Sequence, residues 1–143
     1  MKNLEEIFKQ EPVYLGLFDS KDNVLINFNC YKKPEGYYNR DSPDYNSREY
    51  VNKDLYENVN IIFAFYTDED YSGEAFVLFE KEGRLYEVNG SHCSCYGLED
   101  QWEPSETSLE ELKYRLVEGK MGEGYYGNKY GAELKQFLGI WKK

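Results

Sequence analysis

Three β-rich runs in the middle of the chain constrain its fold more than any other feature. They occupy residues 60–67, 74–81 and 84–90 and read NIIFAFYT, EAFVLFEK and RLYEVNG. The connections DEDYSG and EG are too short for a crossover, so neighbouring strands must run antiparallel. Apolar residues fill both alternating positions of the first two runs, which indicates that both faces are covered. The segment therefore predicts an antiparallel meander with helices packed on it.

The N-terminal part predicts a short helix followed by a hairpin. Asn3 and Glu6 have capping-box spacing at the start of LEEIFKQ, so we expect a helix over residues 4–10. The runs VYLGLFDS and NVLINFNCY, at residues 13–20 and 23–31, are apolar and β-branched. Because the turn-forming letters DSKDN join them, they predict two paired strands.

The C-terminal part supplies two further helices. Residues 106–119 carry the most regular helical pattern of the chain, with Thr107 and Glu110 at capping-box spacing. Its apolar stripe consists of Leu109, Leu112 and Leu116. A last short helix is expected over residues 132–143. Together these elements predict one α+β domain over residues 1–143, with an antiparallel sheet of about five strands and two or three helices.

Residues 32–58 interrupt this regular pattern. The segment is rich in Tyr, Asn and Asp and shows no sustained periodicity, which predicts a long loop, with or without a short helix near its end. Long loops in small domains often carry function. Two interpretations therefore remain open, a functional loop and a surface insertion.

The charge of the chain restricts its partners. Seventeen basic and 27 acidic residues give a formal net charge of −10. Such a surface repels phosphate backbones and anionic membranes, so direct binding to nucleic acid or to a membrane is not expected. The start of the chain, MKNLEEIFKQEP, is too polar for a signal peptide, and no apolar run reaches the roughly 18 residues that a membrane span needs. We therefore expect a cytoplasmic protein.

Rare residue types gather in NGSHCSCYGLEDQWEP, residues 89–104. The only histidine, His92, adjoins Cys93 and Cys95, and with Cys30 they make up a Cys₃His set that could bind zinc. Structural zinc sites usually separate two cysteines by two to four residues, whereas Cys93 and Cys95 are separated by one. In an extended strand both sulfurs would lie on one face, further apart than a single zinc ion favours. Zinc is thus the alternative to a protein without a cofactor whose thiols are buried fillers.

Two acidic segments are candidates for binding a partner. The candidate residues are Asp68, Glu69 and Asp70 in the first connection, and Glu99, Asp100, Trp102 and Glu103 in the corner after the cysteines. Trp102 has a second interpretation, as a core residue packed beneath the next helix. Carboxylates in such a run have no neighbour that singles out an acid and a base.

The segment at residues 71–112 resembles a family of small proteins encoded in bacteriophage and prophage genomes. The words YEVNGSHCSCYGLE and QWEP carry this resemblance. It implies a phage origin, and by analogy a protein that binds a host protein stoichiometrically, such as an inhibitor of a nucleic-acid-dependent defence system. The chain lacks a phosphate loop, a nucleophile elbow and a paired-histidine zinc helix, which disfavours the common enzyme classes. A zinc- or thiol-dependent enzyme and a small-ligand binder, both using SHCSC, remain the alternatives.

Overall fold

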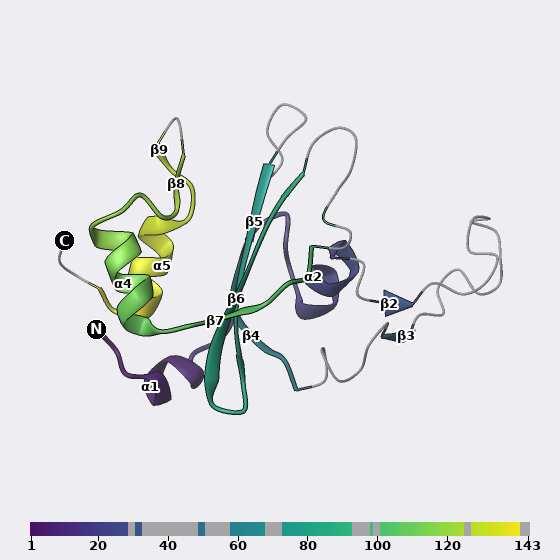
Figure 1. Cartoon of the computed structure of the whole chain (residues 1–143), viewed down its shortest axis with the longest axis horizontal. Coiled ribbons are helices and arrows are strands. Elements are labelled where there is room, and N and C mark those ends of the chain that lie inside the picture. Colours follow the sequence, from purple (N-terminus) through teal and green to yellow (C-terminus); the bar gives the residue numbers. More distant parts are fainter. Residues whose placement is uncertain are drawn as a thin grey trace.

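A five-stranded sheet with helices on both faces forms the centre of the protein (Figure 1). The structure is a computed structural model that describes residues 1–28, 31–32, 49–50, 58–67, 73–92, 98, 101–124 and 127–140. In spatial order the strands are β1 (Val13–Gly16), β4 (Asn60–Tyr66), β5 (Gly73–Lys81), β6 (Arg84–His92) and β7 (Ser105–Thr107). Strands β4, β5 and β6 pair antiparallel, as the sequence predicts. Strand β7, which also pairs antiparallel with β6, was not predicted, because residues 106 and 107 were assigned to the start of the next helix. The α+β class is therefore confirmed.

Strand β1 gives the sheet one parallel pair. It lies beside β4 with Val13 opposite Phe63 and Gly16 opposite Tyr66, so the sheet is mixed and not purely antiparallel. Two short ladders lie outside the sheet. They pair β2 (Tyr31–Lys32) with β3 (Glu49–Tyr50) and β8 (Glu123–Gly124) with β9 (Gly127–Asn128).

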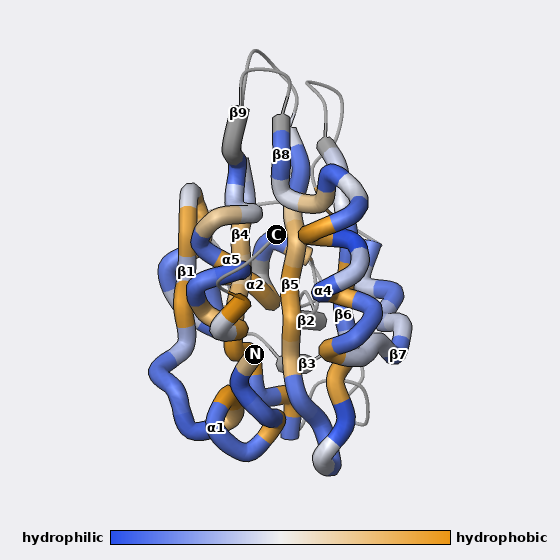
Figure 2. Tube along the Cα trace, turned by 90° about the vertical axis from the view of Figure 1, so that its left-hand side faces the viewer, coloured by the Kyte–Doolittle hydropathy of each residue, from blue (hydrophilic) through white to orange (hydrophobic). Residues whose placement is uncertain are grey.

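The helices divide between the two faces of the sheet. Helices α1 (Leu4–Phe8), α4 (Leu109–Val117) and α5 (Gly131–Leu138) lie on one face, and α2 (Lys21–Asn27) lies on the other (Figures 1 and 2). Among the described residues, none of these helices has the length and apolarity that a bilayer span requires.

Alternation along the strands produces two separate cores. In β5, Phe76 and Leu78 point to the core under α1, α4 and α5, whereas Val77 and Phe79 point to the core under α2. Aromatic rings stack in both layers: Phe76 on Tyr130 with centroids 5.0 Å apart, and Phe79 on Trp102 at 5.6 Å. The apolar letters at both alternating positions therefore reflect a sheet that is covered on both sides.

The predicted hairpin at residues 13–31 is wrong in its second half. Residues 13–16 form β1, which pairs with β4, whereas residues 23–27 of the expected second strand belong to helix α2. Ser20 begins this helix, because its Oγ accepts from the amide of Asn23 at 3.1 Å and its carbonyl accepts from the amide of Val24 at 3.0 Å. Val24, Leu25 and Phe28 share the buried face. The letters DSKDN therefore start a helix instead of closing a hairpin.

The other predicted helices are present with adjusted ends. Asn3 and Glu6 form the expected capping box at α1. Helix α4 is capped by Ser108, whose Oγ accepts from the amide of Glu111 at 3.1 Å, and not by Thr107, which ends β7. Helix α5 ends at Leu138, where Gly139 adopts a left-handed conformation. Most of the 32–58 loop lies outside the described residues.

Both outer strands of the sheet are short. Strand β1 has four residues and β7 has three, and each follows closely after a proline, Pro12 and Pro104. Proline has no amide hydrogen to offer, and short edge strands resist the addition of a foreign strand. These two outer strands are therefore poor places for a partner to extend the sheet.

Candidate functional site

Most residues of the predicted sites lie outside the described part of the chain. This is true of Cys30, Asp68, Glu69, Asp70, Cys93, Cys95, Glu99 and Asp100. His92 is described only as the last residue of β6. Among the residues that the structure does describe, no three His, Cys, Asp or Glu side chains are grouped to hold a metal ion. The zinc site therefore stays a prediction.

Trp102 belongs to the core and offers little surface to a partner. Its side chain is only 8% exposed, and its ring meets Phe28 edge-on at 5.3 Å and stacks on Phe79 at 5.6 Å. It thus packs on the α2 face of the sheet, not beneath the next helix, α4, which covers the opposite face. Glu103, the following candidate, is exposed.

Gln101 joins the predicted corner to the end of β6. Its Oε1 accepts from the amide of Ser91 at 2.8 Å, and its Nε2 donates to the carbonyl of Ser91 at 2.7 Å. The side chain thereby bonds to the edge of β6 past the three residues that pair with β7. Gly90 allows this approach, since a Cβ there would lie 3.2 Å from Gln101 Oε1 and 3.1 Å from Leu98. These two hydrogen bonds, the Gln101 clamp, hold residue 101 beside the end of β6.

Gln101→Ala is expected to lower the free energy of unfolding by about 1 kcal/mol, because two hydrogen bonds are lost but water reaches the exposed Ser91 backbone. The amide of Ser91 should also lose protection against hydrogen exchange. Chemical denaturation and exchange measured by NMR check both results. Gln136→Ala, at an exposed glutamine of α5, is the control. Unchanged protection of Ser91 in the Gln101 variant would contradict the clamp.

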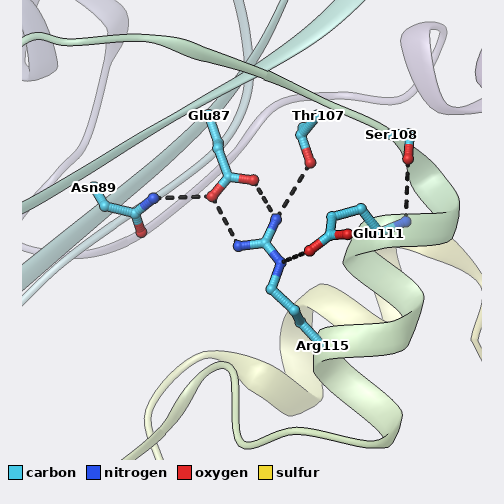
Figure 3. A network of polar contacts seen from close by, with 6 residues as sticks. All are labelled: Glu87, Asn89, Thr107, Ser108, Glu111 and Arg115. Carbon is cyan, nitrogen blue, oxygen red and sulfur yellow. Dashed lines mark hydrogen bonds and ion pairs between the residues drawn. The ribbon is translucent and has the colours of Figure 1, made fainter.

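A polar network of side chains links β6 to α4 (Figure 3). Glu87 is 5% exposed, and both of its carboxylate oxygens accept from the guanidinium of Arg115, Oε1 from Nη1 at 3.0 Å and Oε2 from Nη2. Asn89 Nδ2 donates to Glu87 at 2.9 Å, and Arg115 Nη2 also donates to Thr107 at 3.2 Å. Arg115 Nε lies 3.0 Å from a carboxylate oxygen of Glu111. One guanidinium thus ties together β6, β7 and α4.

The surroundings of Glu87 keep it ionised. Burial acts to raise the pKa of its carboxyl, but hydrogen bonds from Arg115 and Asn89 outweigh burial and hold that pKa below its usual range. Its carboxylate in turn raises the pKa of Arg115. Close by, burial raises the pKa of the Tyr130 phenol, with a smaller contribution from the charges of Glu74 and Glu87. Tyr130 therefore stays protonated and cannot serve as a base near neutral pH.

This network is suited to positioning and not to proton transfer. The carboxylate of Glu87 is already neutralised by a bidentate cation, and Tyr130 holds its proton tightly. An open hollow of about 650 Å³ lies over the network, with Ser105, Glu106 and Ser108 on its rim. The Glu87–Arg115 ion pair holds α4 against the sheet and so sets the orientation of the outward side of that helix.

Sequence reasoning missed this network, although a signal was present. Glu87 lies two residues after Leu85 in a strand that was predicted correctly, and side chains at this spacing share one face of the sheet. Glu87 must therefore point inward with that leucine. Arg115 lies three residues after Leu112 and next to Leu116, at the border of the apolar stripe of α4. The inward acid of the strand and the base at the border of the helix stripe were therefore signals in the sequence for an ion pair between Glu87 and Arg115.

No protein-family model, no curated protein and no solved structure matches the chain. The resemblance of residues 71–112 to small phage proteins therefore stays a prediction from the sequence.

Proposed function

We propose that the protein acts by stoichiometric binding to a host protein, without turnover, in the cytoplasm of a bacterium that carries a phage or prophage. In this proposal the target is a defence protein that handles nucleic acid, and it is held by an acidic surface. The observation that carries the proposal is the outward face of α4, which consists of Glu110, Glu111, Tyr114 and Glu118.

The geometry of α4 supports this choice of surface. The buried stripe of the helix is Leu109, Leu112 and Leu116. At 3.6 residues per turn, the four residues of the outward face lie directly opposite that stripe, and all four are exposed. Lys113 lies on one flank of the outward face. Arg115, on the other flank, bonds inward to Glu87 and pairs through Nε with Glu111. Glu111 is therefore partly neutralised, and the proposal relies chiefly on Glu110 and Glu118.

The rest of the chain favours the same type of partner. A net charge of −10 steers association with a basic surface, and the acidic candidates Asp68, Glu69, Asp70, Glu99 and Asp100 add to that field. Strand addition is disfavoured by the short, proline-flanked edges of the sheet. We therefore place the binding surface on the side chains of a firmly anchored helix, α4.

Replacing Glu110 and Glu118 by lysine is expected to weaken binding to the captured host protein about tenfold, since each reversal turns an attraction into a repulsion. Raising the salt concentration from 0.1 M to 1 M should weaken wild-type binding as well, because the screening length falls from about 10 Å to about 3 Å. Pull-down from a bacterial lysate followed by calorimetry measures both effects.

The matched control is Glu11→Lys with Glu82→Lys, which makes the same change in net charge at exposed positions outside α4. Thermal unfolding shows that each variant folds. Equal loss of affinity in both double variants would assign binding to net charge and not to α4. Sustained turnover by the protein alone, abolished by His92→Ala or Cys93→Ser, would replace the binding proposal with an enzyme.

A further inference from the structure

We infer, on the basis of the proposed function, that the outward face of α4 occupies a groove of the partner that otherwise binds single-stranded nucleic acid. Tyr114 takes the place of a base, and the glutamates around it take the places of phosphates. The inference names the chemical class of the partner, which the charge of the chain alone does not define.

Tyr114 is the exposed one among the tyrosines whose burial the structure describes. It is 66% exposed, whereas Tyr66 and Tyr130 are buried in the two cores. Its position on the helix puts Glu110 four residues before it, Glu111 three residues before it and Glu118 four residues after it. Side chains at these spacings are neighbours, about 5–6 Å apart at Cβ. Because Arg115 pairs with Glu111, the negative charge beside the exposed ring comes chiefly from Glu110 on one side and Glu118 on the other.

This arrangement matches one kind of protein groove. Proteins that bind single strands combine a basic groove, which follows the phosphates, with aromatic side chains on which the bases stack. A tyrosine ring between carboxylates offers both contacts at once, a π face and negative charge on either side. Grooves for duplex nucleic acid contact chiefly the phosphates and base edges, and would leave the ring without a stacking partner.

The anchoring of α4 adds to the match. Arg115 on the inward flank holds the helix to Glu87 and Thr107, and three leucines bury its inner stripe. The outward face is thus fixed before a partner arrives, which reduces the conformational entropy lost on binding. A flexible acidic segment would supply charge but would not hold a ring between two charged groups.

The test is competition between nucleic acids for the captured partner. The protein is immobilised and a bacterial lysate is passed over it. The captured partner is then eluted either with a 20-nucleotide oligothymidine or with a 20-base-pair duplex, at equal phosphate concentration. We expect the single strand to release the partner at a concentration at least tenfold lower than the duplex does. The released partner should bind labelled oligothymidine, and wild-type protein should displace that label.

Variants at the ring separate stacking from charge. Tyr114→Ala should weaken displacement of the oligothymidine about tenfold or more, whereas Tyr114→Phe should preserve it, since stacking needs the ring and not the hydroxyl. Leu17→Ala is the control for loss of exposed apolar surface, because Leu17 is 54% exposed and lies beyond the end of β1.

The inference is overturned if the single strand releases no partner, if the duplex releases it equally well, or if Tyr114→Ala binds like the wild type. In those cases the proposed function still stands as long as Glu110→Lys with Glu118→Lys weakens binding. If nothing is retained from the lysate, both fail together.

Discussion

Gly16→Ala is expected to lower the free energy of unfolding by about 3–5 kcal/mol. At this position the chain leaves β1 with φ +69°, a left-handed conformation that costs an alanine about 1–2 kcal/mol. A Cβ would also stand 2.0 Å from the carbonyl oxygen of Tyr66, the residue paired with Gly16 across the two strands. That oxygen accepts from the amide of Leu17 at 2.9 Å, so relief of the clash must disturb the parallel pair.

Gly83→Ala separates the two causes of this loss. Gly83 has φ +80° in the turn between β5 and β6, but a Cβ there would meet nothing within 4 Å. Its substitution should therefore cost only about 1–2 kcal/mol, from backbone conformation alone. Chemical denaturation of both variants at neutral pH measures the difference. If the two variants lose equal stability, the close approach of Gly16 to β4 is not a constraint on the fold.

Much of the fold follows from short-range patterns. The central strands were predicted correctly because β-rich runs and the short connections between them are signals that act over a few neighbouring residues. The short apolar run VLINF misled the interpretation, because a buried strand and a short amphipathic helix can carry the same letters. The parallel pairing of β1 with β4 joins segments more than forty residues apart in the sequence, and no local signal specifies it.

The site was harder to predict than the fold. His92 and the cysteines are rare residue types in this sequence and so suggest a site, whereas the residues of the described network are common types. Glu87 and Arg115 become notable only when the inward side of β6 and the border of the α4 stripe are placed opposite each other. That step depends on which face of the sheet α4 covers, and hydrophobic periodicity does not determine this.

Arg115→Ala is expected to lower the free energy of unfolding by about 3 kcal/mol at neutral pH. Removing one partner of a buried ion pair leaves the other as an uncompensated charge, which costs about 3–5 kcal/mol. We expect the lower end of this range because the Arg115 side chain is 33% exposed, so solvent already screens part of its interaction. The loss is still large because Glu87 is almost fully buried. Lys113→Ala, on the exposed flank of the same helix, should change stability by less than about 0.5 kcal/mol.

The dependence of this loss on pH identifies its cause. In the wild type the pKa of Glu87 is lowered, so its stabilising effect is present above the ordinary carboxyl pKa and disappears as the pH falls through the lowered value. In Arg115→Ala, burial without a cation should raise that pKa instead, so protonation relieves the variant on acidification. The difference in unfolding free energy should therefore be largest near pH 7 and shrink towards about pH 4. Adding Glu87→Gln to Arg115→Ala should restore part of the stability at pH 7. If the double variant recovers nothing and the difference does not change with pH, Arg115 stabilises α4 through the packing of its methylene chain and not through its charge.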